Sequence, residues 1–332
     1  MTRPRKATIT DIAKRVNMTT VTVSRALHQP EKVKKDTLEH ILAVARELDY
    51  VPNAMARNLK GQQSRLLGLV TASLDNPFYG ETIKAITREA KKRDYSLMLF
   101  DTDGCPELEA RAVETLLSYQ VAGILLSVVS DDDDYQPSYL HQLERANIPV
   151  VQVDRKLANS SFPGVYLDSE QSGFRGAQAL LEQGHRHFLV VGGPQGSGIT
   201  RSRLAGIRRA LDACEETTSL DVLHGDYTQA PARAAVSEYL ASGKRPDVIF
   251  GLNMLITLGS LEAMRQRGLN RTDIALFSID QVHYAEIYGD PIPCVRHSCT
   301  ALGQTAINML LQKIDDPESD AHDEILEGEL KN

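Results

Sequence analysis

The sequence is poor in the features that mark secreted and membrane-spanning proteins. Its 332 residues include four cysteines (105, 214, 294 and 299), which form no C-x-x-C pair and show no zinc-ligand spacing, so we expect reduced thiols. No apolar run reaches the length of a membrane span, and no signal-type apolar segment follows the charged N-terminus. These absences predict a cytoplasmic protein without a membrane anchor.

The chain also lacks a recognisable catalytic or metal-binding set. We find no nucleophile, base and orienting group at a spacing that would bring them together. GGPQGSG (192–198) has neither the Lys-Ser/Thr of a P-loop nor the spacing of a dinucleotide fingerprint, and is better interpreted as a turn. The aspartate run 131–134 lacks the Gly and distal Glu of a calcium loop, so we expect a solvated surface loop. The sequence thus favours a binding protein without cofactor or metal over an enzyme.

The negative net charge conceals an uneven distribution. The whole chain carries −7, yet residues 1–61 hold 12 Lys and Arg against 6 Asp and Glu, while the remainder carries −13. A basic segment on an acidic body is expected when one end of a protein contacts nucleic-acid phosphates. At this length the chain can form more than one domain. The charges therefore separate a candidate nucleic-acid-binding segment from a larger body.

The basic segment shows the periodicity of three short helices. Apolar residues recur at helical spacing over 9–16, and Thr8 with Asp11 forms a capping-box pattern at the start. Asn17 follows where the chain must turn sharply, because asparagine tolerates a left-handed backbone. Thr19 can cap a second helix, and a third helix buries apolar residues over 38–48.

The second of these helices carries side chains suited to the DNA major groove. Its apolar positions Val23, Ala26 and Leu27 are expected to face inward. The residues left partly outward are Thr20, Val21, Thr22, Ser24 and Arg25. Arg pairs bidentately with guanine in the major groove, and small polar residues fit there. Spacing alone is equally compatible with a generic three-helix bundle.

Beyond the polar break at 61–64, short apolar runs alternate with helical segments. The predicted strands are 66–70, 96–100, 122–129, 149–154, 165–167, 187–193, 220–225, 247–252, 274–280 and a last strand in EILEGEL (324–330). The predicted helices are 78–93, 106–119, 138–146, 172–183, 201–213, 231–241 and 255–266. This order predicts two doubly wound α/β lobes in succession, with a binding crevice at the carboxyl ends of their parallel strands.

Polar and aromatic residues at these strand ends are suited to a polyhydroxylated ring. Carboxylates and amides accept from vicinal hydroxyls, Arg donates in a fork, and aromatic faces cover the apolar side of a sugar. The candidates are Asn76, Phe78, Tyr79, Asp101, Asp154, Arg155, Arg203, Asn253 and Asp280. An alternative reading is that the Asp and Asn residues only cap the helices that follow.

Several segments in fixed order resemble the LacI/GalR family of bacterial regulators. DIAKRVNMTTVTVSRAL (11–27) is similar to that family's helix-turn-helix, and YVPNAMARNLKG (50–61) is similar to its hinge segment. In the body, DNPFY (75–79), VDR (153–155), RSRLAG (201–206) and SID (278–280) resemble the family's regulatory core. Asn17 departs from the usual Gly, and Lys34 from the usual cap before the third helix.

The resemblance implies how the chain would bind DNA. The second helix would read the major groove, and a hinge helix over about 53–61 would enter the minor groove, where Leu59 would wedge between base pairs. The implied DNA-binding residues are Thr8, Thr19, Thr20, Val21, Thr22, Ser24, Arg25, Asn53, Ala56, Arg57 and Leu59. Such heads act in pairs, so a homodimer on a near-palindromic DNA operator is expected, and no leucine heptads follow that would support a tetramer.

The resemblance also implies an effector site between the lobes. His297 stands at a pocket-edge position often held by Gln, and Met254 at one often held by Asp, so ligand identity does not carry over. With two carboxylates against two guanidiniums, and a negative balance if Asp101 reaches the cleft, an uncharged sugar, polyol or sugar acid is favoured over a sugar phosphate. Alternatives are a purine-sensing regulator of the same architecture and a sugar-binding protein whose helical head serves another partner.

These interpretations set the expected domain boundaries. Residues 1–61 would form the DNA-binding headpiece with its hinge helix, and 62–332 the effector-binding and dimerisation core. Within the core, the N-lobe would comprise about 62–160 and 294–322, and the C-lobe about 161–293 and 323–332. The expected function is that of a transcription regulator of carbohydrate genes, more specifically a repressor. The effector could either release this repressor from DNA or promote its binding to DNA.

Overall fold

The computed structural model describes residues 7–51, 64–283, 285, 287, 289 and 291–331. The chain divides into two compact units, Met1–Gln63 and Ser64–Asn332, two residues beyond the predicted boundary. We call the described parts of these units the head and the core. The predicted hinge residues Asn53, Ala56, Arg57 and Leu59 lie outside the described ranges. Across those ranges, no helix combines the length and apolar character needed to span a bilayer.

The head is helical, as the periodicity predicts. Its elements are α1 (Ile9–Arg15), α2 (Thr20–His28), the short 3-10 helix η1 (Pro30–Lys32) and α3 (Lys35–Glu47). The Thr8 hydroxyl accepts from the Asp11 N–H while the Asp11 carboxylate accepts from the Thr8 N–H, which confirms the capping box. Asn17 has a φ of 53°, as the predicted turn requires. All three α-helices contribute to one apolar core: Ile12, Ala13, Val16, Val23, Ala26, Ile41, Val44 and Ala45.

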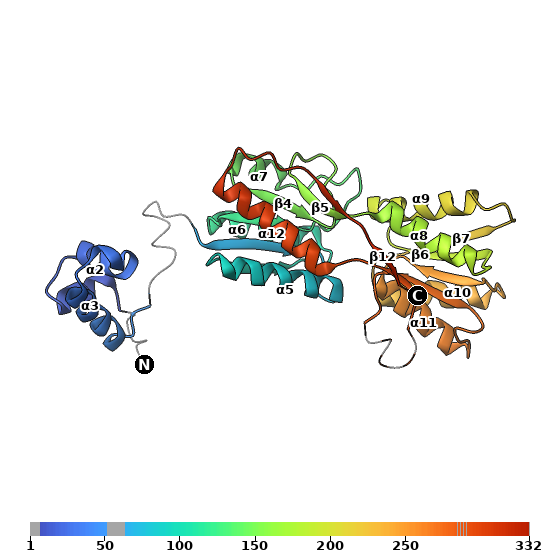
Figure 1. The fold of residues 1–332 in the computed structure, drawn as a ribbon, viewed down its shortest axis with the longest axis horizontal. Coiled ribbons are helices and arrows are strands. Elements are labelled where there is room, and N and C mark those ends of the chain that lie inside the picture. The colour runs from blue at the N-terminus through green and yellow to red at the C-terminus, as the bar shows by residue number, and fades with distance from the viewer. Residues whose placement is uncertain are drawn as a thin grey trace. The chain divides into compact units, whose positions relative to one another are not determined.

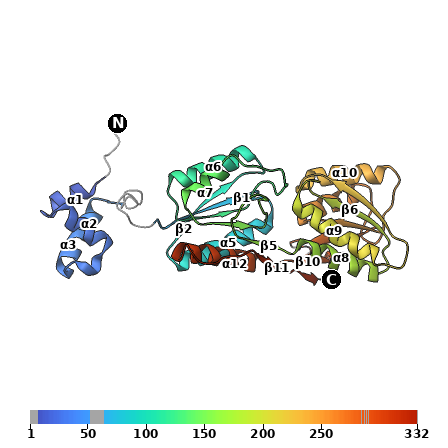
Figure 2. The same cartoon turned by 90° about the horizontal axis from the view of Figure 1, so that it is seen from above.

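The N-lobe of the core is a parallel sheet in the order β11-β5-β4-β3-β1-β2. Its strands are β1 (Leu66–Thr71), β2 (Ser96–Asp101), β3 (Gly123–Leu126), β4 (Val150–Val153), β5 (Gly164–Leu167) and β11 (Glu324–Leu326). One face is covered by α5 (Pro77–Lys92) and α12 (Cys299–Asp315), the other by α6 (Pro106–Ser118) and α7 (Leu140–Ala146) (Figure 2). Burial on both faces explains why the central strands are continuous apolar runs.

The C-lobe repeats this architecture, with the sheet order β12-β10-β9-β8-β6-β7. Its strands are β6 (His187–Gly192), β7 (Ser219–His224), β8 (Val248–Gly251), β9 (Ala275–Ile279), β10 (Cys294–Arg296) and β12 (Glu329–Lys331), the last antiparallel to β10. One face carries α8 (Ser169–Glu182) and α9 (Gly198–Asp212), the other α10 (Gln229–Ala241) and α11 (Met254–Gln266). A helical head followed by two doubly wound lobes is therefore the observed fold.

The chain passes between the lobes three times. The first crossover is Asp168, between β5 and α8; the second is 297–298, between β10 and α12; the third is 327–328, between β11 and β12. Figure 1 shows the C-terminal segment leaving α12 along the N-lobe and ending in β12 beside the C-lobe sheet.

These crossovers correct the predicted lobe boundaries. Strand β5 and strand β11 pair within the N-lobe sheet, whereas the sequence pattern predicts 161–167 and 323–326 in the C-lobe. Strand β10 pairs within the C-lobe sheet, whereas the sequence pattern predicts 294–296 in the N-lobe. EILEGEL, predicted as one strand, forms β11 and β12 in different sheets. Runs of three or four apolar residues do not encode which sheet they join, because long-range backbone pairing decides it.

Candidate DNA-contacting helix and interlobe cleft

Helix α2 presents the predicted polar face to solvent. The Thr19 hydroxyl accepts from the Thr22 N–H at 3.2 Å and caps the helix, while Val23 and Ala26 are buried against the rest of the head. Val21 is 64% exposed, so its side chain is accessible on this face of the helix. The other predicted positions are exposed or half-buried: Thr8, Thr19, Thr20, Thr22, Ser24 and Arg25.

Eight of the ten predicted effector-site residues line one cavity of about 40 Å³ between the lobes. The N-lobe contributes Asn76, Phe78, Tyr79, Asp154 and Arg155, and the C-lobe contributes Ile199, Arg203, Tyr227, Asn253 and Asp280. The strands that precede these residues end at the same side of each sheet, so side chains far apart in sequence meet in the cleft.

A second cavity of about 280 Å³ shares lining residues with the first. Asn76, Phe78 and Asp280 line both cavities, and His297 and Met254 line the second. Asp101, by contrast, is exposed at the end of β2, accepts from the Asp103 N–H at 3.2 Å and lines neither cavity. Its place at a strand end was correctly predicted, but β2 is the edge strand, so its end lies beside the cleft instead of within it.

Asp154 and Asp280 occupy equivalent places in the two lobes. Each follows a central strand in a left-handed backbone conformation, with φ of 68° and 69°. The Tyr79 hydroxyl donates to Asp154 Oδ2 at 2.8 Å, and His297 Nδ1 lies 3.0 Å from Asp280 Oδ1. Burial raises the pKa of Asp154 against the charge of Arg155. Burial also acts to raise the pKa of Asp280, but the bond from His297 and nearby positive charge hold it below its ordinary value.

The two arginines approach the cavity from opposite lobes. Arg155 donates to the carbonyl oxygens of Val128 and Val129 at 3.3 and 2.6 Å, and its guanidinium lies 5.1 Å from the centre of the Tyr227 ring across the cleft. Arg203 is only 4% exposed and donates through Nη1 to the carbonyl of Leu252. Its buried Nε has no acceptor in the described part of the chain. An unmet buried donor of this kind costs free energy until an acceptor arrives.

The two asparagines cap the helices that follow them, as the alternative interpretation predicts. Asn76 Oδ1 accepts from the Phe78 N–H at 3.1 Å and caps α5, and Asn253 Oδ1 accepts from the Ile256 N–H at 2.7 Å and caps α11. Both still line the central cavity. Capping therefore fixes their orientation without removing them from the cleft.

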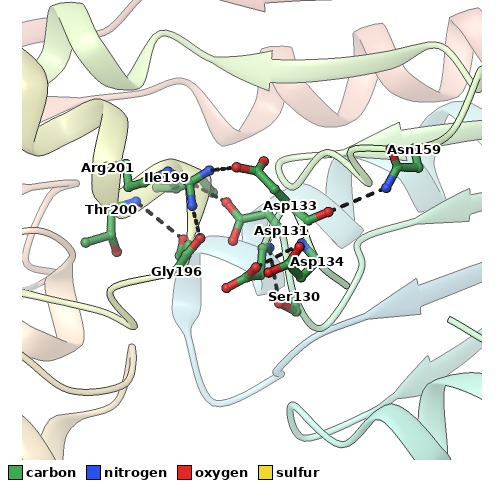
Figure 3. A network of polar contacts seen from close by, with 11 residues as sticks. Ser130, Asp131, Asp133, Asp134, Asn159, Gly196, Ile199, Thr200 and Arg201 are labelled. Atoms are coloured by element: carbon green, nitrogen blue, oxygen red, sulfur yellow. Dashed lines mark hydrogen bonds and ion pairs between the residues drawn. The ribbon is translucent and has the colours of Figure 1, made fainter. Parts of the chain in front are cut away.

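The aspartate run 131–134 was expected to be a solvated surface loop, and this is confirmed for Asp133 and Asp134, which are exposed, but wrong for Asp131, which joins the lobes. Asp131 is buried, and its carboxylate accepts from the Ile199 N–H at 2.7 Å in the first turn of α9. Asp133 Oδ2 pairs with Arg201 Nη2 at 2.7 Å, and Figure 3 shows Arg201 reaching from α9 to this loop. We call these contacts the interlobe latch. The four residues fall in different environments because only some of them face α9.

Two further residues line the central cavity without having been predicted from the sequence. Tyr227 follows the carboxyl end of β7, and Ile199 lies in the first turn of α9 after β6. The strand-end rule that selected the other residues applies equally to the segment after β7, so Tyr227 was accessible to the same reasoning. Ile199 could not be predicted in this way, because an aliphatic residue in a helix is normally expected in the hydrophobic core.

Two family models match the chain. Residues 64–327 match the model of periplasmic binding proteins and sugar binding domain of LacI family, and residues 8–53 match the model of bacterial regulatory proteins, lacI family. The HTH-type transcriptional repressor PurR of Escherichia coli O1:K1 / APEC is 28% identical over 330 residues, which cover 97% of this chain and 96% of that protein.

Two solved structures of LacI-type regulators are similar to the chain. The lac repressor dimer bound to operator and the anti-inducer ONPF is 25% identical, with a TM-score of 0.84 and coverage of 99% of this chain and 98% of that one. The complex of the transcriptional regulator CelR with cellobiose is 25% identical, with a TM-score of 0.72 and coverage of 99% of both chains. The first family model alone spans most of the core. The chain therefore belongs to the LacI family of bacterial regulatory proteins and is a DNA-binding transcriptional repressor of that family.

Proposed function

We propose that this repressor binds a near-palindromic operator as a homodimer and that a small sugar-type effector in the interlobe cleft controls its DNA affinity. The outward face of α2 and the net charge of +6 over residues 1–61 support the DNA part of this proposal. The similar lac repressor is a dimer bound to operator in its crystal structure. Paired heads require a two-fold-related DNA site.

The proposed DNA contacts divide between α2 and the hinge. Thr20, Val21 and Arg25 would read base edges in the major groove. Asn53, Ala56, Arg57 and Leu59 would complete the contacts from the hinge segment. Leu59 would insert between base pairs and kink the DNA, at an unstacking cost of about a few kcal/mol per step.

The cleft supports a ligand rich in hydroxyl groups. The observation that carries this proposal is the meeting of eight predicted residues from both lobes around one cavity, with the buried Arg203 Nε still lacking an acceptor within the described residues. A sugar hydroxyl can accept from Arg203 and donate to Asp154 or Asp280 at the same time. Phe78 and Tyr79 supply apolar surface for the face of the ring.

The charge balance of the cleft favours an uncharged ligand. Asp154 and Asp280 oppose Arg155 and Arg203, and His297 is bonded to Asp280. A phosphate would bring nearly two further negative charges into a buried site, which is expensive without additional cations. We therefore place a sugar, polyol or sugar acid ahead of a sugar phosphate.

Control of DNA binding would follow from lobe movement. The central cavity of about 40 Å³ holds only a few water molecules, at roughly 10–15 Å³ each, so a ring that contacted all of its lining residues would need the lobes to move apart. A ligand that binds one lobe arrangement more tightly shifts the population toward it. The coupling reaches DNA if the two arrangements place the paired heads differently.

A purine is the second candidate effector. The relative from Escherichia coli that is 28% identical is named as the repressor PurR, and the cleft carries three aromatic rings, Phe78, Tyr79 and Tyr227, that offer flat surfaces to a base. A planar base would use the same Asp and Arg groups as hydrogen-bond partners.

Footprinting with a ligand panel tests the proposal. Purified chain would be footprinted on the DNA upstream of its own gene, with and without sugars, sugar phosphates and purines, and each ligand would be titrated by calorimetry. We expect a symmetric footprint and micromolar binding of an unphosphorylated sugar. Asp280→Ala should abolish the effector response and leave DNA binding in place. Binding of a sugar phosphate without binding of its parent sugar, or of a purine alone, would overturn the sugar proposal.

A further inference from the structure

His297 lies at the junction between the cleft and the crossovers. Its side chain is 1% exposed, and its Nδ1 lies 3.0 Å from Asp280 Oδ1 in the cleft. Its Nε2 lies 2.9 Å from Ser172 Oγ, in the first turn of α8. One imidazole ring therefore bridges a cavity carboxylate and a helix that begins directly after a crossover.

The ring is part of one crossover, lies close to another and reaches the remaining one through Ser172. His297 is itself the first residue of the second crossover. Ser172 donates to the carbonyl of Asp168, the first crossover, at 2.6 Å. A Cβ atom on Gly328, in the third crossover, would lie 2.8 Å from His297 Nε2, so glycine allows the close approach. When one lobe rotates relative to the other, the backbone of these three segments must change.

Hydrogen-bond distances hold the ring from both sides. Asp280 Oδ1 lies at Nδ1, and Ser172 Oγ lies at Nε2. The orientation of the imidazole is therefore set jointly by the cleft and by the start of α8.

We infer that His297 is a positioning residue that orients the Asp280 carboxylate in the cleft and transmits its displacement by ligand to the three crossovers. This inference rests on the proposed function for its ligand but not for its geometry. A ligand donor that pulls on Asp280 would stretch the Asp280–His297–Ser172 chain, which changes the crossover where α8 begins. The cavity and the lobe angle would thereby share one set of hydrogen bonds.

The ligand-free test is a ¹⁵N spectrum of the full chain labelled at histidine. His297→Gln assigns the ring by removing its signals. We expect Nδ1 of His297 to carry the proton that bonds to Asp280, and Asp280→Asn to shift that signal. A parent ring without a proton on Nδ1 would overturn the inference, and this result requires no ligand. His187→Gln is a matched control, because His187 Nδ1 bonds Ser219 Oγ at 2.7 Å at the opposite end of the C-lobe strands.

Ligand and DNA titrations separate positioning from coupling. The probe is whichever of glucose, ribose or cellobiose binds the parent chain, with a DNA fragment that the chain selects from a random library. His297→Gln should weaken sugar affinity roughly tenfold, as expected for losing a bond to a charged group. Ser172→Ala should keep sugar affinity within about twofold but reduce the sugar-induced change in DNA affinity by roughly fivefold.

The outcomes distinguish this inference from the proposed function. If none of the sugars binds the parent chain, the sugar proposal fails, but the spectrum still shows whether Nδ1 of His297 carries the proton bonded to Asp280. If Ser172→Ala retains the full sugar-induced change in DNA affinity, the route through Ser172 is wrong. Equal effects of His187→Gln and His297→Gln would reduce His297 to a general structural role and contradict the inference.

Discussion

At the scale of single residues, the pKa values of two carboxylates in similar places are shifted in opposite directions. Asp154 and Asp280 follow central strands with nearly the same positive φ, yet the pKa of Asp154 is raised and that of Asp280 is lowered. Burial acts on both in the same sense. The difference comes from the partners, since Asp280 receives a hydrogen bond from the His297 ring whereas Asp154 receives one from the neutral Tyr79 hydroxyl.

Asp280→Asn should flatten the loss of stability on acidification. The folded-state pKa of Asp280 lies below its unfolded value, so its contribution is complete above the unfolded pKa of about 3.9 and is lost as the pH falls through the folded pKa. Asparagine does not titrate and removes that pH-dependent part. Urea denaturation at neutral and acidic pH measures the slope, with exposed Asp101→Asn as the control. Parallel slopes for the parent and Asp280→Asn would contradict the prediction.

Arg25→Ala should weaken and relax DNA recognition. Arg25 is exposed on α2, and loss of a bidentate contact to guanine costs about 1–3 kcal/mol per half-site. Arg15→Ala is the matched control, because it removes the same charge from α1, where Arg15 pairs with Glu47 at 3.7 Å. Binding to selected and scrambled sites should show lost discrimination for Arg25→Ala alone. For the parent, log K should fall with log salt by about 0.9 per phosphate neutralised.

At the scale of elements, α8 and α9 pack with unusually close backbones. A Cβ on Gly173 of α8 would lie 2.1 Å from the Arg203 carbonyl of α9, and one on Gly206 would lie 1.9 Å from the Glu170 carbonyl. Reciprocal glycines thus allow the two helices to meet along both backbones. Since Arg203 lines the cavity, this packing also sets the position of a cleft residue.

Gly173→Ala should destabilise the core and weaken effector binding together. The added methyl group forces α9 away from α8, and such overpacking costs about 1–3 kcal/mol. Gly80→Ala provides the contrast, because a Cβ at Gly80 in α5 meets nothing within 4 Å and alanine favours a helix by about 0.5–1 kcal/mol. Urea denaturation should therefore give shifts of opposite sign. If Gly173→Ala left the free energy of unfolding unchanged, α9 would be able to shift away from α8 without cost.

At the scale of the whole core, the interlobe latch opposes separation of the lobes. Asp131 caps the first turn of α9 from the other lobe, where a carboxylate is favoured by the unpaired N–H groups of a helix N-terminus. Asp133 adds an exposed pair with Arg201 that contributes little by itself. The buried contact therefore carries most of the stabilisation, and any ligand that needs an open cleft must break it.

Asp131→Ala should increase the open population of the ligand-free core. Loss of a hydrogen bond to a charged acceptor costs about 1.5–3 kcal/mol, equivalent to a shift of roughly tenfold or more in a two-state equilibrium. Distances between spin labels on the two lobes measure the shift. Asp134→Ala is the control on the same loop, since Asp134 joins the network through its backbone N–H. Unchanged distance distributions in Asp131→Ala would exclude a latch.

The sequence by itself determined the head, the alternation of strands and helices, and most of the cleft. Periodicity, capping residues such as Thr8 and the ends of parallel strands are local signals, so they identified α2 and residues such as Asp154 and Asp280. Only the tertiary structure decided that β5, β10 and β11 change sheets, that Asp101 lies outside the cleft, and that Asp131 meets Ile199. Ser172 and His297 are 125 positions apart, and contacts at that separation depend on the packing of whole lobes, which no local pattern records.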